Sequence, residues 1–293
     1  MLFKPEYDEN GNLTKDLNKN ITAIQYNCLN LPSRVMFANG NSISYLYDAA
    51  GRKLRTVHFL EGDSVTTDYC GNVVYENGVP QILLTEVGYV SLTDGKYHYY
   101  LKDHQGNNRV VVDEEGTVEE VNDYYAFGGL MSTSSRQSVQ PYKYNGKELD
   151  RKGGLDWYDY GARHYDSVLG RWNGVDPLCE DYYSENPYGY CGNNPVNYVD
   201  PNGLMKVLYN PDGTYKETTH NNWFHNTFMG RQEYIDYGDR KVHLSESEFW
   251  QWQRRGSNEN VGTVLFRMTM FRYRQRQQQR HCLNISWMKC WIL

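Results

Sequence analysis

The stretch "YLYDAAGRKLRTV", residues 45–57, contains one copy of a motif that recurs through the first part of the chain. Related stretches begin at Tyr7 (YDENGNL), Tyr26 (YNCLNLPSRV) and Tyr69 (YCGNVVY), with Tyr47 between the last two, so that successive copies start 19, 21 and 22 residues apart. A unit of about twenty residues holds two strands of ordinary length and two connections. The spacing therefore predicts a series of repeated β-hairpins.

Turn dipeptides support this prediction, because they tolerate the positive φ angles of tight hairpin turns. They are Asn39-Gly40, Asn77-Gly78, Asp94-Gly95 and Asn145-Gly146, and Glu115-Gly116 lies between two further strand-like runs. The high content of Tyr and Gly, 27 and 26 of 293 residues, favours short, half-buried strands. We expect a mainly β fold with a long, curved antiparallel sheet; an ordinary β-sandwich is the alternative.

The charge of the chain is divided unevenly. The net charge is −6, but residues 1–204 carry 17 Lys and Arg against 28 Asp and Glu, whereas residues 205–293 carry 13 against 8. Such a division predicts two parts with different partners. A basic end is more often a solvated face or a tail than a site for nucleic acid, so we expect nucleic acid as a partner only if this tail is a nuclease.

Several classes of site and segment are absent from the sequence. The six cysteines, at positions 28, 70, 179, 191, 282 and 290, form no CxxC pair and no zinc-type grouping, so we predict no metal site and no cofactor. The opening MLFKPEYDENGN lacks the pattern of a signal peptide, and no stretch approaches the roughly 20 apolar residues of a membrane span. We expect a cytoplasmic chain before any export by another route.

Two long motifs resemble a known family. The repeats YDENGNLT and YLYDAAGRKLRTV are similar to the YD repeats of Rhs proteins and of the C component of insecticidal toxin complexes. The stretches PYKYNGKELDRKGGLDWYDYGARHYDSVLGRWNGVDPL (141–178) and ENPYGYCGNNPVNYVDPNG (185–203) resemble the Rhs repeat-associated core domain. The resemblance implies a YD-repeat sheet over residues 1–125, the core domain over 126–204 and a variable C-terminal segment over 205–293. The sheet would be part of the β-shell that family members build around a cargo.

Two aspartates stand in repeated Val-Asp-Pro corners, Asp176 and Asp200. Two carboxylates that lie close together hold one proton between them, which provides a base and an acid in one site. Such a pair can activate water against a peptide carbonyl. The two aspartates are 24 positions apart, a separation long enough to bring them together, although sequence alone does not show that they meet.

The resemblance assigns roles to these residues. Rhs and toxin-complex C proteins are understood to cut themselves by an aspartyl-type activity after the Leu of an Asp-Pro-x-Gly-Leu motif. Carried over, Asp176 and Asp200 match the catalytic pair, Arg163 in GARHYD matches the essential arginine, and the scissile bond joins Leu204 to Met205. Arg163 is expected to hold one carboxylate in its charged form through paired hydrogen bonds.

The same residues have simpler interpretations. Asp-Pro-x-Gly is an ordinary turn, in which Asp bonds its own backbone, and Arg163 is equally consistent with an inter-strand ion pair. Cys179 and Cys191 are interpreted as small buried residues and not as nucleophiles. His104 in LKDHQGNNRVVVD is interpreted as a turn-stabilising residue, because no second ligand lies at a suitable spacing.

The segment after residue 204 does not contain the repeat motifs of the first part of the chain. It begins with a hairpin-like MKVLYNPDGTYKETT, and LSESEFWQWQRR predicts a capped helix start at Ser245 with Glu248 three residues on. His220, His225 and His243 supply imidazoles, but no paired carboxylate set accompanies them, so a nuclease is a minor alternative. The position of this segment after the core domain implies a toxin cargo. Trp287 and Trp291 lie near the end of the segment, where the sequence has no amphipathic periodicity.

The sequence therefore predicts the C-terminal part of an Rhs-type polymorphic toxin, which encloses a cargo and releases it by self-cleavage. Expected partners are a longer YD-repeat chain or secretion machinery, and an immunity protein. The alternatives are a cell-surface or carbohydrate-binding YD-repeat module, whose tyrosines stack on sugars, and an inactive orphan remnant.

Overall fold

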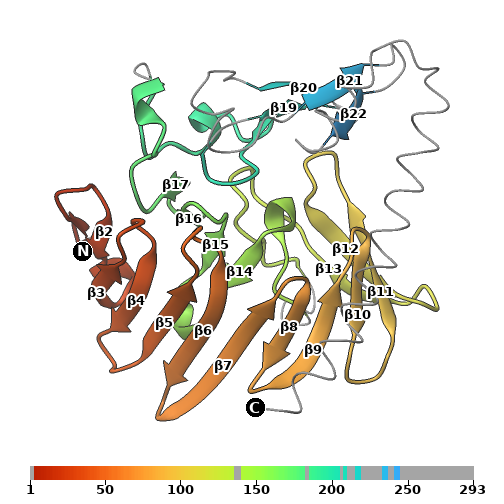
Figure 1. Cartoon of the computed structure of the whole chain (residues 1–293), viewed down its shortest axis with the longest axis horizontal. Coiled ribbons are helices and arrows are strands. Elements are labelled where there is room, and N and C mark those ends of the chain that lie inside the picture. The colour runs from red at the N-terminus through yellow and green to blue at the C-terminus, as the bar shows by residue number, and fades with distance from the viewer. Residues whose placement is uncertain are drawn as a thin grey trace. The chain divides into compact units, whose positions relative to one another are not determined.

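The computed structural model describes residues 3–134, 140–181 and 185–204, and beyond them the backbone of four short strands (Figure 1). The chain divides into two compact units, Met1–Asn221 and Asn222–Leu293, and each is described by itself. The predicted boundaries at 125/126 and 204/205 remain predictions.

The first unit is dominated by one antiparallel sheet of eleven strands, in which every strand pairs with its neighbour in the chain. The strands are β3 (Ile21–Tyr26), β4 (Pro32–Phe37), β5 (Ser42–Tyr47), β6 (Lys53–Leu60), β7 (Asp63–Cys70), β8 (Val73–Glu76), β9 (Val79–Leu84), β10 (Gly88–Ser91), β11 (Tyr97–Lys102), β12 (Asn108–Asp113) and β13 (Val118–Val121). This open, curved meander confirms the predicted mainly β fold and differs from a two-sheet sandwich (Figure 1).

Smaller elements surround this sheet. A two-stranded sheet pairs β1 (Glu6–Tyr7) with β2 (Leu13–Lys15), and a four-stranded sheet contains β14 (Glu148–Asp150), β15 (Trp157–Asp159), β16 (His164–Asp166) and β17 (Arg171–Trp172). A third sheet joins β18 (Tyr198–Val199) to β19 (Val207–Tyr209) and β20 (Tyr215–Thr218). The short 3₁₀ helices are η1 (Leu17–Lys19), η2 (Tyr144–Gly146), η3 (Lys152–Gly154), η4 (Cys179–Asp181) and η5 (Tyr190–Asn193).

The repeated turns have a common chemical basis, the pattern Asp-x-x-Gly-x. In the turn between β5 and β6, Oδ1 of Asp48 accepts hydrogen bonds from the backbone N–H groups of Ala50 and Arg52, both at 2.9 Å. Gly51 supplies the positive φ, 79°, that closes the turn. The same two contacts recur in the turns that begin at Asp103 and Asp113. The repeat is therefore a local device that reverses the chain at regular intervals.

The predicted turn dipeptides lie between strands, with one difference. Asn39-Gly40, Asn77-Gly78, Asp94-Gly95 and Glu115-Gly116 each connect adjacent strands of the large sheet. Asn145-Gly146 instead lies in η2, where both residues have positive φ, and closes an isolated bridge between Tyr142 and Glu148. The dipeptide specifies the turn, while the tertiary setting decides whether strands of a sheet flank it.

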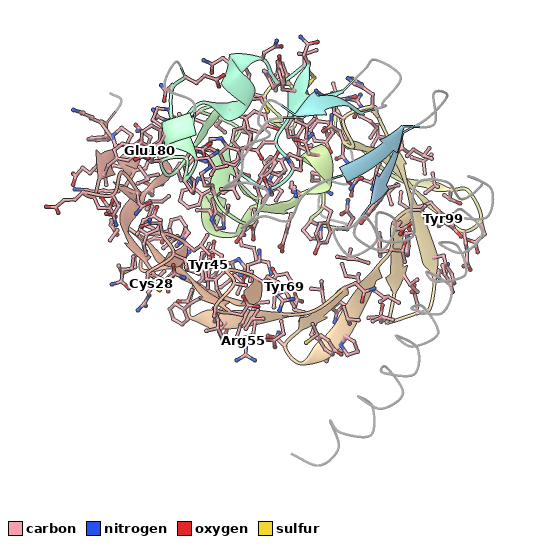
Figure 2. The ribbon with its side chains drawn as sticks, turned by 45° about the horizontal axis from the view of Figure 1, so that its top comes forward. Cys28, Tyr45, Arg55, Tyr69, Tyr99 and Glu180 are labelled. Atoms are coloured by element: carbon pink, nitrogen blue, oxygen red, sulfur yellow. The ribbon has the colours of Figure 1, made fainter. Side chains whose placement is uncertain are left out.

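The inner face of the sheet packs against the segment that follows it. A core cluster combines strand residues with Leu155 and Trp157, and its buried members are Leu13, Ile21, Ile24, Val35, Phe37, Ile43, Tyr45, Leu155 and Trp157. Figure 2 shows the sheet as an arc, with Tyr45 and Tyr69 on the inner side and Arg55 on the outer side. Alternation along each strand thus separates a packed face from a solvated one.

A second core consists mainly of aromatic rings. Its buried members are Tyr144, Leu149, Tyr158, Tyr160, Tyr165, Trp172, Tyr190 and Cys191. The rings of Tyr165 and Tyr190 stack with centroids 4.2 Å apart. Tyr160 donates from its hydroxyl to Oδ1 of Asn145 at 2.7 Å, and Tyr190 does the same. These bonds satisfy the buried hydroxyls, so tyrosine replaces phenylalanine in this core without an unpaired polar group.

Buried charges also hold the four-stranded sheet against the large one. Nζ of Lys53 on β6 lies 2.7 Å from Oε2 of Glu148 and 2.6 Å from Oδ2 of Asp159. Tyr69 donates to the other oxygen of Glu148 at 2.7 Å. Nε2 of His58 contacts Asp150 at 2.9 Å. Each of these contacts joins residues far apart in sequence and fixes the site region relative to the sheet.

The second unit contains one described hairpin, β21 (Glu233–Asp236) paired with β22 (Lys241–Leu244). His243 is on β22, whereas His220, His225, the predicted helix start at Ser245 and Glu248, Trp287 and Trp291 lie outside the described residues. Throughout the described part of the chain, no helix combines the length and apolar character needed to cross a bilayer.

Candidate functional site

Asp200 begins another Asp-x-x-Gly-x turn, with an unusually complete set of backbone contacts. Its Oδ1 accepts hydrogen bonds from the N–H groups of Asn202 at 3.1 Å, Gly203 at 2.7 Å and Leu204 at 3.2 Å. Gly203 has the positive φ of the repeat turns, 81°. The local fold of this motif is therefore the same turn that Asp48 forms on the sheet, and the turn alone does not distinguish the site.

Burial and charge distinguish Asp200 from the turn aspartates of the sheet. It is 3% exposed, and burial raises the pKa of its carboxyl to about 6, against the lowering effect of Arg163 and the backbone N–H groups. A carboxyl with this pKa exchanges a proton near neutral pH, which an exposed aspartate does not.

Asp176 reaches the same place from the loop after β17. Its Oδ1 accepts from the N–H of Leu178 at 2.8 Å, and its Oδ2 accepts from Nη2 of Arg163 at 2.7 Å. Burial raises the pKa of Asp176, and Arg163 opposes that rise. The two Val-Asp-Pro corners therefore supply two carboxyls whose pKa values are both raised by burial.

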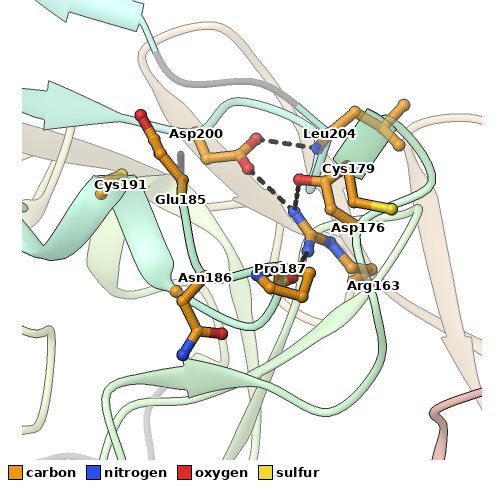
Figure 3. A pocket seen from close by; sticks show the side chains of 11 residues that line it. Arg163, Asp176, Cys179, Glu185, Asn186, Pro187, Cys191, Asp200 and Leu204 are labelled. Atoms are coloured by element: carbon orange, nitrogen blue, oxygen red, sulfur yellow. Dashed lines mark hydrogen bonds and ion pairs between the residues drawn. The ribbon is translucent and has the colours of Figure 1, made fainter. Parts of the chain in front are cut away.

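Arg163 lies between the two aspartates at the entry to β16 (Figure 3). Its Nη2 is 2.7 Å from Oδ2 of Asp176 and 3.7 Å from Oδ2 of Asp200. Its other nitrogens donate to backbone carbonyls, Nε to Gly203 at 2.6 Å and Nη1 to Pro187 at 3.1 Å. The sequence predicted paired bonds from Arg163 to one carboxylate; the structure instead has a single bond to Asp176, because the remaining donors hold the backbone.

The guanidinium is buried as well as bonded. Its carbon lies 4.3 Å from the ring centroid of Trp172, a cation–π contact. Burial lowers the pKa of Arg163, and the two aspartates act against this. An arginine stays protonated under all relevant conditions, so the site contains one fixed positive charge between two titratable acids.

A small cavity of about 30 Å³ opens beside these groups. It is lined by Arg163, Asp176, Cys179, Glu185, Asn186, Pro187, Gly189, Cys191, Gly192, Asp200 and Leu204. The volume exceeds what one water molecule needs, and its walls provide polar partners for it. The arrangement can therefore bring water, two carboxyls and a backbone turn together, which is the chemistry of acid–base hydrolysis.

The residues at the predicted cut are placed only in part. Leu204 is buried, lines the cavity and donates its N–H to Asp200. Met205 lies outside the described residues. The structure thus brings Asp176, Asp200, Arg163 and Leu204 together and leaves the far side of the predicted bond undescribed.

Other candidate residues have no comparable setting. His104 is exposed in the turn after β11. Cys179 and Cys191 are not joined in a disulfide bond and both line the cavity, with Cys191 buried in the aromatic core. Within the described ranges, no three His, Cys, Asp or Glu side chains cluster as metal ligands would.

Sequence reasoning missed three contributors to the site. They are the Trp172 ring under Arg163, the Pro187 carbonyl, and Lys147, whose Nζ donates to the carbonyl of Pro201 at 2.6 Å. Burial lowers the pKa of Lys147. All three lie in the stretches 141–178 and 185–203, so the motif contained them, but only the fold shows that they meet Asp200 and its turn.

Comparison with known proteins extends these findings. No family model matches the chain. Among curated proteins, the chain is 31% identical over 227 residues to Salivary gland surface protein 1 of Aedes aegypti, covering 69% of this chain and 7% of that protein. It is 29% identical over 224 residues to the tRNA3(Ser)-specific nuclease WapA of Bacillus spizizenii, covering 67% and 9%. Over 100 residues it is 36% identical to Toxin subunit YenC2 of Yersinia entomophaga, covering 33% and 10%.

The fold is also shared with a solved toxin assembly. The structure of the Photorhabdus luminescens Tc holotoxin pore matches with a TM-score of 0.57 and 22% identity, covering 72% of this chain and 11% of the matched chain. The chain is an Rhs/YD-repeat protein of the toxin-related family. This Rhs/YD-repeat protein spans between 7% and 10% of the length of the curated relatives above.

Proposed function

We propose that this Rhs/YD-repeat protein cleaves its own backbone between Leu204 and Met205 and so releases the segment after residue 204. The proposal rests on one observation above all: Asp176 and Asp200, from separate corners, both contact Nη2 of Arg163, while Asp200 also bonds the N–H of Leu204. An ordinary turn needs only the bond from Asp200 to a backbone N–H and not the contacts with Arg163.

The chemistry follows from the different settings of the two acids. Asp176 has the shorter contact with Arg163, which favours its carboxylate form and makes it the base that takes a proton from water. Asp200, whose pKa is about 6, is the acid that polarises the Leu204 carbonyl and protonates the leaving amide. Arg163 bonds the Gly203 carbonyl and holds the turn in place during attack.

Intact-mass measurement of the expressed full chain tests the proposal. The expected result is two fragments, residues 1–204 and 205–293, from the parent chain, and uncut chain from Asp176→Asn and Asp200→Asn. Asp48→Asn is the matched control, because Asp48 makes the same type of turn contacts but does not contact Arg163. That variant is expected to cut like the parent. A folded parent that stays intact would refute self-cleavage and favour an inactive remnant.

The same proposal includes the partners of the protein. Residues 205–293 are the cargo, and an immunity protein would neutralise it. A longer YD-repeat chain would supply further strands, as in the much longer relatives that this chain matches over about a tenth of their length. A nuclease cargo is a narrower form of this proposal, suggested by the similarity to the tRNA nuclease WapA. Pull-down of tagged residues 205–293 with the products of neighbouring genes tests the immunity partner.

Binding at a cell surface is a second candidate. The name of the mosquito relative and two exposed tyrosines on β11, Tyr97 and Tyr99, favour it. Exposed rings on one strand can stack on sugars. A glycan array with the Tyr97→Ala/Tyr99→Ala double variant tests this, with Tyr125→Ala as a still more exposed control outside the large sheet. The absence of glycan binding by the parent would remove this candidate.

A further inference from the structure

A second cluster of buried polar groups lies at the β13 end of the large sheet and shares no residue with the lining of the aspartate cavity. It joins Glu120 on β13, Asn122 just after it and Lys143 just before η2. Glu120 and Asn122 are fully buried and Lys143 is 1% exposed. Lysine and glutamate are almost never buried so completely unless they are paired, as these two are.

One oxygen atom receives most of the hydrogen bonds in this cluster. Oε1 of Glu120 lies 2.6 Å from Nζ of Lys143 and also accepts from Nδ2 of Asn122. Gln140 donates to the same oxygen at 3.3 Å. Among the described residues, Oε2 of Glu120 and Oδ1 of Asn122 have no hydrogen-bond partner. A lysine amine and an asparagine amide nitrogen therefore meet at a single carboxylate oxygen.

From this geometry we infer that Lys143 and Asn122 form an intramolecular isopeptide bond, with Glu120 as the group that moves the proton. A buried lysine, an amide and a carboxyl that bonds both nitrogens are the parts such a reaction needs. The inference is independent of the proposed self-cleavage.

The reaction balances without any co-reactant. The Lys143 ammonium gives one proton to the Glu120 carboxylate, and the neutral amine attacks Cγ of Asn122. The new bond joins Nζ to Cγ, and the bond from Cγ to Nδ2 breaks. Glu120 returns its proton to the departing nitrogen, and the second amine proton leaves with it, so that ammonium is released and Glu120 is a carboxylate again.

The surroundings of Lys143 favour its reactive form. Burial lowers the pKa of Lys143, against the raising effect of Glu120, so more of the neutral amine is present than on a surface lysine. Because all three side chains are almost fully buried, the amine and the amide carbon are held close together and are little accessible to bulk solvent.

The bond would join two elements that contact each other through the side chains of Glu120, Gln140 and Lys143. β13 is the last strand of the large sheet, and Lys143 belongs to the segment that turns back onto its inner face. A covalent link at this point closes a loop around residues 122–143 and restricts the unfolded chain, as other cross-links do.

Mass spectrometry of the denatured full chain tests the inference. We expect the parent to be about 17 Da lighter than its sequence, the mass of one ammonia lost when an amine replaces an amide nitrogen. After tryptic digestion, the peptides that contain Asn122 and Lys143 are expected as one branched species. If self-cleavage also occurs, the loss of mass is carried by the residue 1–204 fragment, so the two reactions are read separately.

Variants identify the groups involved. Lys143→Arg keeps the positive charge but cannot form the bond, and Glu120→Gln keeps the shape but cannot move the proton, so both are expected at full sequence mass. Asn122→Asp loses water instead of ammonia. Lys152→Arg changes a partly exposed lysine that is paired with Glu76 and serves as the control. This variant is expected to keep the loss of about 17 Da seen in the parent.

The branched peptide is the decisive observation, because succinimide formation at an Asn-Gly pair also removes ammonia but leaves the two peptides separate. A parent chain with the full sequence mass and two separate peptides would overturn the inference and leave the cluster as a structural ion pair.

Discussion

Nε of Arg163 donates to the carbonyl oxygen of Gly203 at 2.6 Å, so the guanidinium holds the backbone of the Asp200 turn as well as a carboxylate. Lysine supplies one ammonium group and cannot bond Gly203, Pro187 and Asp176 together. We therefore predict that Arg163→Lys abolishes cleavage and lowers the free energy of unfolding by about 1–3 kcal/mol, the cost of unsatisfied buried acceptors. Urea denaturation measures the loss. Arg52→Lys, at an exposed ion pair, should leave stability unchanged.

Gly203→Ala is predicted to destabilise the protein more than Gly40→Ala. Both glycines have positive φ, 81° and 86°, so both variants include the backbone cost of about 1–2 kcal/mol. A Cβ at Gly203 would lie 3.0 Å from the backbone N of Arg163, whereas nothing lies within 4 Å of one at Gly40. The difference between their urea midpoints isolates the crowding at the site. Equal midpoints would mean that the Arg163 backbone moves aside freely.

Stability is predicted to fall as the pH rises from about 4 to about 6 because of Asp200. Its pKa is raised to about 6 by burial, so in this window the folded protein binds more protons than the unfolded chain. One such group contributes a slope of at most about −1.4 kcal/mol per pH unit. Asp200→Asn should remove this contribution. The test is the difference in unfolding free energy between parent and variant across the window, which cancels the opposite effect of His164, whose pKa is lowered by burial.

A slope that is the same in both proteins would show that Asp200 titrates normally. Asp48→Asn again serves as the control, because Asp48 makes similar turn contacts in an exposed loop. Its pKa is lowered by bonds from Arg52, so its effect on stability lies at lower pH than the window of Asp200.

Lys53→Met is predicted to lower the free energy of unfolding by at most about 3–5 kcal/mol, the cost for a fully buried pair, because it leaves Glu148 and Asp159, whose side chains are 18% and 16% exposed, without their cation. Tyr69→Phe removes only one neutral donor to Glu148 and should cost about 1 kcal/mol. Thermal or urea unfolding of the two variants measures both losses in unfolding free energy, and we expect the loss in Lys53→Met to be the larger. A small loss in Lys53→Met would indicate that water reaches the two carboxylates.

The hairpins were predictable from sequence because each depends on residues within one turn. Asp48 and Gly51 act on neighbours two to four positions away, so the pattern is visible in any copy of the repeat. The exception, Asn145-Gly146, shows the limit of local information. Its turn forms as expected, but the large sheet ends before it.

The site was predictable in its residue types and not in its contacts. The family resemblance indicated Asp176, Asp200 and Arg163, yet nothing in the sequence states that Nη2 of Arg163 lies between the two carboxyls. The Lys53 ion pairs join segments that are distant in sequence, and the Trp172 ring, although only nine positions after Arg163, meets its guanidinium only after folding. Such contacts leave no periodic signal.

The consecutive pairing of β3 to β13 has a consequence for how the protein folds. Each pairing of neighbouring strands in the large sheet closes only a short loop, which costs little entropy. Such pairings can form while the chain is still being synthesised. The segment after β13 must instead reach back over long separations, as Lys19 does to Leu155 across 136 residues. We therefore expect docking of that segment to be the slow, late step, and until it occurs the inner face of the finished meander would be open to aggregation or to chaperones.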